Sequence, residues 1–244
     1  GSVLYATLGD AITAAKDGET VEVLKKCNFA GMTISKNITV KGADGLAEKP
    51  LITVGASIVP GANAAPTFEG LRFTSTQKVF SFTPDSAGSV LTLKNCDVES
   101  NGYYCVNIDA HGITLNVEGG NYSSDYSVIN FDAKMPQTNE RIIVNVTGAT
   151  MTETAHVNNQ YAVISNNNGK SNVEIHITDS VLNATAPQDA ASGSCIKIGG
   201  NPGGSNVATN NVLTVKNSTL NSNAQYGIYV ERTAKTDITI EDST

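Results

Sequence analysis

The chain of 244 residues has little charge, no basic cluster and few cysteines. Only 16% of its residues are charged, its net charge is −7, and its three arginines are scattered at Arg72, Arg141 and Arg232. Without a basic cluster to neutralise phosphates, nucleic-acid binding is not expected. No stretch approaches the roughly 20 apolar residues that a membrane span needs.

The four cysteines are Cys27, Cys96, Cys105 and Cys195. This number is too small for a scaffold held by disulfides, and no spacing of cysteine and histidine predicts a zinc site. We interpret them as buried free thiols that act as small apolar side chains. A bridge between Cys96 and Cys105 stays open as an alternative.

A repeated pattern organises most of the chain, and Val212 to Ser222 (VLTVKNSTLNS) shows it most clearly. In each copy, aliphatic residues stand four and two positions before a turn residue, and a small residue follows the turn. The turn residues are Asn95, Gly119, Gly148, Asp179, Asn217 and Asp242. Alternation with a period of two predicts a strand with one buried face. Recurrence every 24 to 38 residues predicts stacked coils that bury their apolar faces against one another.

A second column of strands follows the first within each copy. Its segments are VFSF, CVNI, VINF, AVIS, CIKI and GIYV, with predicted core positions at Phe80, Val106, Ile129, Val163, Ile196 and Ile228. Two columns in phase with each other favour a coil of parallel strands over an antiparallel sandwich.

With both columns in place, the chain resembles the right-handed parallel β-helix of the pectin lyase-like superfamily. Asn or Asp at a sharp turn between strands is typical of that fold, because these residues tolerate left-handed backbone angles. The resemblance implies an all-β fold, a single-stranded right-handed parallel β-helix of the kind found in bacterial secreted or cell-surface proteins.

The chain is predicted to form one domain over residues 1–244. Residues 1–20 would hold a short capping helix and the lead-in to the first strand, residues 21–66 irregular first coils, and residues 67–244 regular coils. The last segment, Ile238 to Thr244, is only half a coil. We therefore expect a monomer whose chain continues into further domains beyond Thr244, although an open last coil could also pair end to end.

Catalytic motifs of polysaccharide-cleaving β-helix enzymes are not found in the sequence. Polygalacturonase-like enzymes carry an Asp-Asp pair and a Gly-His-Gly motif, and neither occurs here. Lyase-like chemistry needs an outward arginine beside calcium-binding carboxylates, and no arginine falls at an aligned outward position. We expect a domain without catalytic activity.

One outward stripe of the second column is the best candidate site. The position after each core residue reads Ser81, Asn107, Asn130, Ile164, Lys197 and Tyr229. Asp109 and Asp132 follow two positions later and are predicted to stack on adjacent coils about 5 Å apart. Such a pair could be a catalytic dyad, a calcium site or a sugar contact, with Asn107, Asn130 and Lys197 as ligand-binding neighbours. The alternative is a pair of solvated carboxylates.

Tyrosines offer a second candidate. Tyr103 aligns with Tyr126, and with Tyr229 they could form an aromatic platform for sugar rings. The column of Tyr104, Tyr161 and Tyr226 is predicted to pack inward. The three histidines, His111, His156 and His176, are interpreted as surface residues.

Three hypotheses follow. The first is a non-catalytic secreted or cell-surface domain of a bacterium that presents loops and a polar face to polysaccharides or surface proteins, without a cofactor unless calcium binds at the aspartates. The second is a polysaccharide lyase or glycoside hydrolase that uses Asp109 and Asp132, and the third is a structural spacer. Exposed tyrosines lying parallel would favour binding, whereas a cleft with a basic residue beside the aspartates would favour catalysis.

Overall fold

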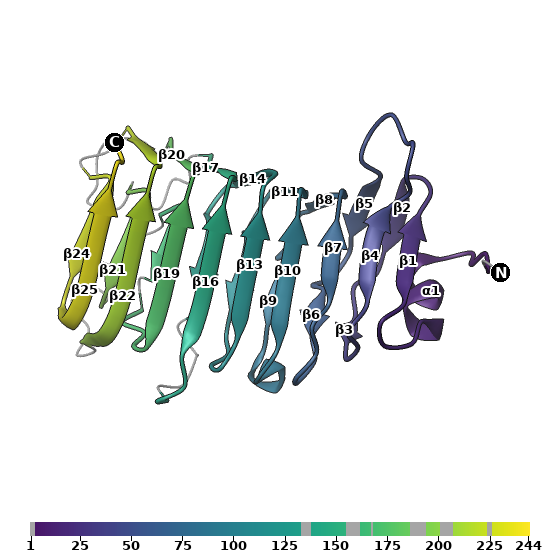
Figure 1. Ribbon diagram of the computed structural model, residues 1–244, viewed down its shortest axis with the longest axis horizontal. Coiled ribbons are helices and arrows are strands. Elements are labelled where there is room, and N and C mark those ends of the chain that lie inside the picture. Colours follow the sequence, from purple (N-terminus) through teal and green to yellow (C-terminus); the bar gives the residue numbers. More distant parts are fainter. Residues whose placement is uncertain are drawn as a thin grey trace.

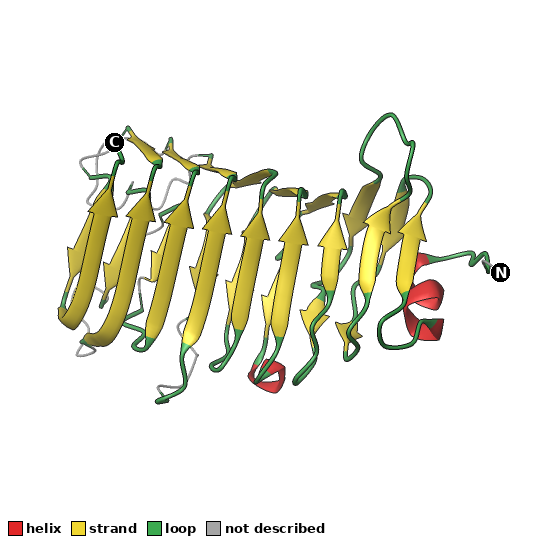
Figure 2. Ribbon diagram, in the orientation of Figure 1, coloured by secondary structure: helices red, strands yellow, loops and turns green. Residues whose placement is uncertain are grey.

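The computed structural model describes residues 3–132, 138–154, 162–166, 168–185, 194–200, 207–223 and 226–244. It is an all-β solenoid in which parallel sheets run along a rod, with one short α-helix at its N-terminal end (Figure 1). Successive strands of the chain go to different sheets, so each strand pairs with a strand of the next coil and not with its neighbour in sequence (Figure 2). The predicted parallel β-helix is confirmed.

The first sheet has nine strands and corresponds to the first predicted column. They are β1 (Thr20–Val23), β4 (Thr39–Gly42), β7 (Thr67–Glu69), β10 (Val90–Lys94), β13 (Thr114–Glu118), β16 (Ile142–Thr147), β19 (Val173–Thr178), β22 (Ala208–Lys216) and β25 (Thr233–Glu241).

The second sheet has eight strands, which begin two residues after the turn residue in the regular coils. They are β2 (Cys27–Phe29), β5 (Leu51–Val54), β8 (Arg72–Ser75), β11 (Asp97–Ser100), β14 (Asn121–Ser124), β17 (Thr150–Glu153), β20 (Val181–Ala184) and β23 (Thr219–Ser222). The sequence patterns did not predict this sheet as a separate column.

The third sheet has six strands and corresponds to the second predicted column. They are β9 (Phe80–Phe82), β12 (Tyr104–Ile108), β15 (Ser127–Phe131), β18 (Ile164–Asn166), β21 (Ile196–Gly199) and β24 (Ile228–Glu231). Near the N-terminus, β3 (Thr33–Ile34) pairs with β6 (Val59–Pro60), and a bridge from Ile58 to Phe80 joins this pair to the third sheet. A 3-10 turn, Pro84–Ser86, follows β9.

The turn residues between the first and second sheets adopt the predicted left-handed backbone conformation. Asn95, Asp179 and Asn217 have φ angles of 46°, 50° and 46°, and Gly119 and Gly148 have φ of 72° and 64°. Only glycine enters this left-handed region without steric cost, and Asn and Asp are the side chains that tolerate it best. The turn residues therefore direct the chain from the first sheet into the second.

The interior is a continuous column of apolar side chains, and the capping helix covers its N-terminal end. Helix α1 (Leu8–Ala14) starts at Thr7, whose hydroxyl accepts a hydrogen bond from the Asp10 amide at 3.1 Å. Leu8 and Ile12 are the buried residues of this helix. The predicted capping helix is confirmed, and no helix in the described part of the chain has the length and apolar character to cross a membrane.

All four cysteines are free thiols, so the alternative of a Cys96–Cys105 bridge is not realised. Cys96, Cys105 and Cys195 are buried, as interpreted, whereas Cys27 is only half-buried. Burial raises the pKa of the Cys96 and Cys195 thiols to about 12, and it also raises the pKa of Cys105. These buried thiols stay protonated at neutral pH and pack as small apolar groups.

Three sequence-based assignments were wrong. Ile129 pairs with Ile164 and not with Val163, so the register of this coil shifts by one residue and Ser165 takes the outward position predicted for Ile164. His111 is buried, with a ring nitrogen 3.3 Å from the Glu140 carbonyl oxygen, and is not a surface residue. Tyr226 is 42% exposed and does not pack inward. Tyr161 and His156 lie outside the described residues.

Candidate functional site

The predicted outward stripe is a continuous row on the third sheet. Strand pairing aligns Ser81, Asn107, Asn130, Ser165, Lys197 and Tyr229 on successive coils. However, Asn107, Asn130 and Lys197 are only 2, 4 and 3% exposed. These three side chains therefore point away from the core, as predicted, but lie beneath the surface of the molecule.

The buried amides of this row bond to one another and to an aspartate. Asn130 donates from Nδ2 to Oδ1 of Asn107 at 2.8 Å, and Asn107 donates from Nδ2 to Oδ2 of Asp132 at 3.2 Å. The Nζ atom of Lys78 lies 3.6 Å from the same carboxylate oxygen. Because these amide groups are already hydrogen-bonded within the protein, the two asparagines position the Asp132 carboxylate and are not themselves available to a ligand.

Asp109 and Asp132 lie on adjacent coils, as predicted, since each directly follows one member of the paired residues Ile108 and Phe131. Their surroundings are not those of an isolated carboxylate pair. Burial lowers the pKa of the Lys170 ammonium group, whereas the negative charges of Asp109 and Asp132 raise it by a smaller amount. Together, Lys78 and Lys170 offset the negative charge of the pair.

This charge balance argues against a calcium site. Calcium takes six to eight oxygen ligands and is attracted by uncompensated carboxylates. Here two ammonium groups already act on the two aspartates. Within the described ranges, no group of three or more histidine, cysteine, aspartate or glutamate side chains is arranged to hold a metal ion.

Aromatic rings gather beside this network. The rings of Tyr103 and Tyr126 are stacked, with centroids 5.6 Å apart and planes 11° apart. Tyr104 lies edge-on to both at 6.0 Å, and Nζ of Lys78 lies 5.9 Å from the Tyr104 ring centroid. Tyr103 is 42% exposed, Tyr126 is partly exposed and Tyr104 is buried, so the first two form the accessible part.

We call Lys78, Tyr103, Tyr104, Tyr126 and Asp132 the tyrosine–lysine cluster. The sequence predicted the neighbouring positions of Tyr103 and Tyr126. It did not predict that Lys78 joins the aromatic rings to Asp132, because a lysine side chain can extend in several directions from the same backbone position. Nothing in the pattern marked Lys170 as a neighbour of the aspartates.

Tyr229 does not belong to the cluster. Its strand, β24, lies three strands beyond β15 in the third sheet. There its ring is 5.4 Å from that of Tyr226, and Nζ of Lys197 lies 5.4 Å from its centroid. The predicted platform of three tyrosines is therefore divided between two places.

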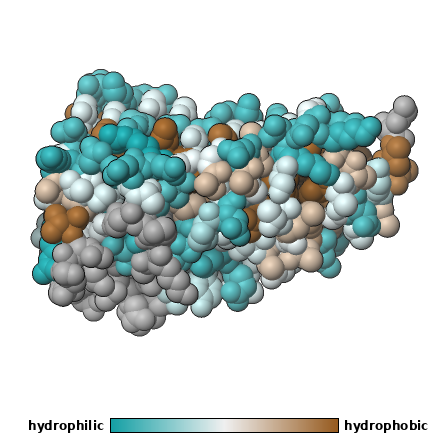
Figure 3. Space-filling view, turned by 90° about the horizontal axis from the view of Figure 1, so that it is seen from below, coloured by the Kyte–Doolittle hydropathy of each residue, from teal (hydrophilic) through white to brown (hydrophobic). Residues whose placement is uncertain are grey.

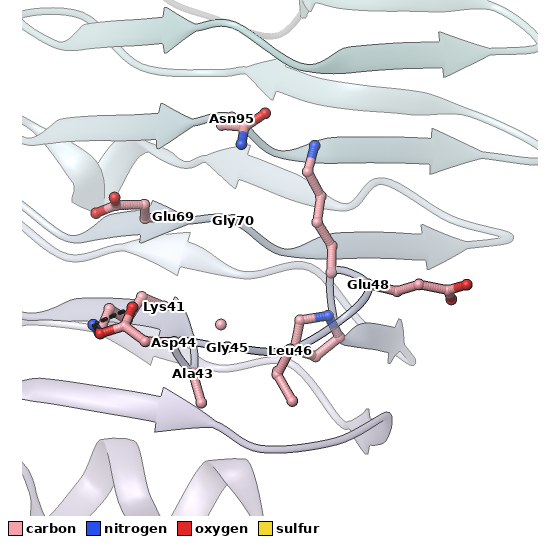
Figure 4. A pocket seen from close by; sticks show the side chains of 12 residues that line it. Lys41, Ala43, Asp44, Gly45, Leu46, Glu48, Glu69, Gly70 and Asn95 are labelled. Carbon is pink, nitrogen blue, oxygen red and sulfur yellow. Dashed lines mark hydrogen bonds and ion pairs between the residues drawn. The ribbon is translucent and has the colours of Figure 1, made fainter.

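A separate hollow of about 330 Å³ lies near the N-terminal end, beside the loop between β4 and β5 (Figure 4). Charged side chains line it, among them Lys41, Asp44, Glu48 and Glu69, and Lys41 is paired with Asp44 at 3.1 Å. No aromatic side chain lines this hollow, so it does not provide the flat apolar surface that a sugar ring prefers.

The fold defines the class of the protein as a parallel β-helix solenoid with a small aromatic and charged cluster on one sheet. No protein family model, curated protein or solved structure matches the chain.

Proposed function

We propose that the chain is a non-catalytic glycan-binding domain that contacts sugars through the tyrosine–lysine cluster. The observation that carries this proposal is the stacked and accessible ring pair of Tyr103 and Tyr126. A right-handed coil of the pectin lyase-like kind, and a secreted or cell-surface location in a bacterium, belong to the same proposal. They are supported by the left-handed turn residues and by the low proportion of charged residues in the chain.

The ring pair suits weak binding of a polysaccharide. With centroids 5.6 Å apart, nearly parallel rings must be offset, so part of each ring face stays uncovered by the other ring. The side chains of Asp132 and Lys78 are 20% and 33% exposed and stand near the rings as polar partners for hydroxyl groups. A flat apolar surface next to a few fixed polar groups is the usual composition of a ligand site.

The buried amide row makes this surface rigid. Asn107 holds the Asp132 carboxylate from below, and Asn130 holds Asn107. Binding groups that are fixed before the ligand arrives lose little conformational entropy on binding. Catalysis by Asp109 and Asp132 is the alternative, and the lysines Lys78 and Lys170 beside the two aspartates are the observation that favours it.

The proposal is tested by titrating the protein with acidic and neutral polysaccharides while following both binding and the release of reducing or unsaturated ends. Tyr103→Ala and Tyr126→Ala are each expected to weaken binding about tenfold, which corresponds to the loss of one stacking contact. Tyr5→Ala is the matched control, because Tyr5 is equally exposed at 46% but belongs to the N-terminal segment.

Two results would reject the proposal. Product release that disappears in Asp109→Ala or Asp132→Ala would make the chain a polysaccharide-cleaving enzyme. The absence of binding to every polysaccharide would favour a structural spacer or a domain that binds protein.

A further inference from the structure

One lysine of the third sheet is buried without an ion pair. The side of the rod seen in Figure 3 is mainly hydrophilic, as expected when polar groups stay in the solvent. Lys197, in contrast, is only 3% exposed. Within the described ranges its Nζ atom makes no hydrogen bond or ion pair, and it faces the ring of Tyr229, whose centroid is 5.4 Å away. The ring attracts the ammonium group but carries no negative charge.

The charge of Lys197 is only partly balanced. Burial lowers the pKa of its ammonium group, and the negative charge of Glu231 raises it by a smaller amount. Lys170 is equally buried, but the charges of both Asp109 and Asp132 act on it. A buried ammonium group without an ion pair costs free energy unless a counter-charge reaches it. The surroundings of Lys197 therefore favour the approach of an anion.

A serine hydroxyl beside Lys197 also lacks a partner. Strand pairing places Ser165 of β18 next to Lys197 of β21, so both side chains point away from the core on neighbouring coils. Ser165 is fully buried, and its Oγ atom has no hydrogen-bond partner in the part of the chain that the structure describes. In the same row, the amides of Asn107 and Asn130 are bonded to each other. That half of the row is satisfied, whereas the half at Ser165 and Lys197 is not.

One acceptor oxygen can serve both of these donors. Neighbouring strands are about 4.8 Å apart, and a hydrogen bond from an ammonium or hydroxyl group spans about 2.8 Å. An oxygen atom between the two side chains can therefore accept from Nζ of Lys197 and from Oγ of Ser165. A water molecule in this place would satisfy the hydroxyl group but would leave the charge of the lysine uncompensated. A negatively charged oxygen satisfies both.

We propose that Lys197 and Ser165 bind a compact oxyanion, such as sulfate, phosphate or a carboxylate, which accepts hydrogen bonds from both side chains. Because both residues are buried, the site suits a small ion and not a polysaccharide chain. It lies on β18 and β21, each of which has a strand on either side. The proposal is independent of the glycan-binding function, because the tyrosine–lysine cluster belongs to the coils of β9, β12 and β15.

The test is isothermal titration calorimetry of the chain, dialysed into chloride, with sodium sulfate, inorganic phosphate and acetate at constant ionic strength. The wild type is expected to bind at least one of these anions saturably, and the comparison shows whether the site takes a tetrahedral oxyanion or a carboxylate. Lys197→Met should raise the dissociation constant about tenfold or more, and Ser165→Ala about fivefold. Glu231→Gln should lower it, because that variant removes a negative charge near the anion.

Lys94→Met is the matched control, because Lys94 is a partly exposed lysine of the first sheet that pairs with Glu118 at 3.6 Å. It should bind the anion as the wild type does. In thermal melts in chloride, Lys197→Met should melt at the same temperature as the wild type or higher, because the substitution removes a buried charge. A wild type that binds none of the three anions, a Lys197→Met variant that binds them equally well, or one that melts several degrees lower in chloride would each overturn the proposal.

Discussion

We expect Phe80→Ala to lower the free energy of unfolding by about 3–5 kcal/mol, the usual cost of removing a buried phenylalanine. Phe80 is fully buried at the centre of one coil, where Phe68 and Phe73 reach it from the other two sheets. The centroid distances from Phe80 are 5.3 Å to Phe68 and 5.1 Å to Phe73. A cavity at this point removes contacts from all three sheets at once.

Urea denaturation followed by circular dichroism measures this change. Tyr5→Ala is a suitable control, since that ring is 46% exposed and its loss should change stability by less than about 0.5 kcal/mol. If Phe80→Ala cost as little as the control, the three rings could not be the centre of the core. Because solenoids are stabilised coil by coil, the variant is also expected to broaden the transition.

Gly120→Ala is expected to have the second large effect, a loss of about 3 kcal/mol or more. Gly120 has a φ of 89°, and a β-carbon added there would lie 1.9 Å from the Cys96 carbonyl oxygen of the preceding coil. The backbone of two stacked coils would have to separate. The substitution therefore adds a steric clash to the cost of a left-handed alanine.

Gly148 provides the comparison for this prediction. Its φ is 64°, but a β-carbon there would have no atom within 4 Å. Gly148→Ala should cost only about 1–2 kcal/mol, and Gly148→Asn less, because Asn95 and Asn217 adopt the same conformation in the same column. Thermal melts of the three variants test this order, and equal losses for the two alanine variants would contradict the stacking of Gly120 against Cys96.

The sequence predicted those parts of the fold that depend on short patterns. The turn residues such as Asn95 and Asp179 were located correctly, because only a few residue types accept a left-handed conformation. The strands of the first sheet from β10 to β25 were located because they alternate over five or more residues. The second sheet was not recognised, because a strand of four residues such as Asp97–Ser100 contains too little alternation to separate it from the turn before it.

The candidate site was less accessible to prediction from sequence. Alternation shows that Asn107 and Asn130 point away from the core, but it does not show what covers them. Their burial depends on tertiary contacts, among them those of Lys78 and Asp132, whose side chains come from different coils. The one-residue error at Val163 arose because Val163 and Ile164 are both buried, so hydrophobicity alone could not fix the register.

Hydrogen–deuterium exchange of the protein, with and without a polysaccharide that it binds, tests the proposed function most directly. The account predicts that the ligand slows exchange around Lys78, Tyr103 and Tyr126, and leaves the outer face of the first sheet and the hollow beside Lys41 unchanged. Protection at either of those places, with none at the tyrosine–lysine cluster, would contradict it.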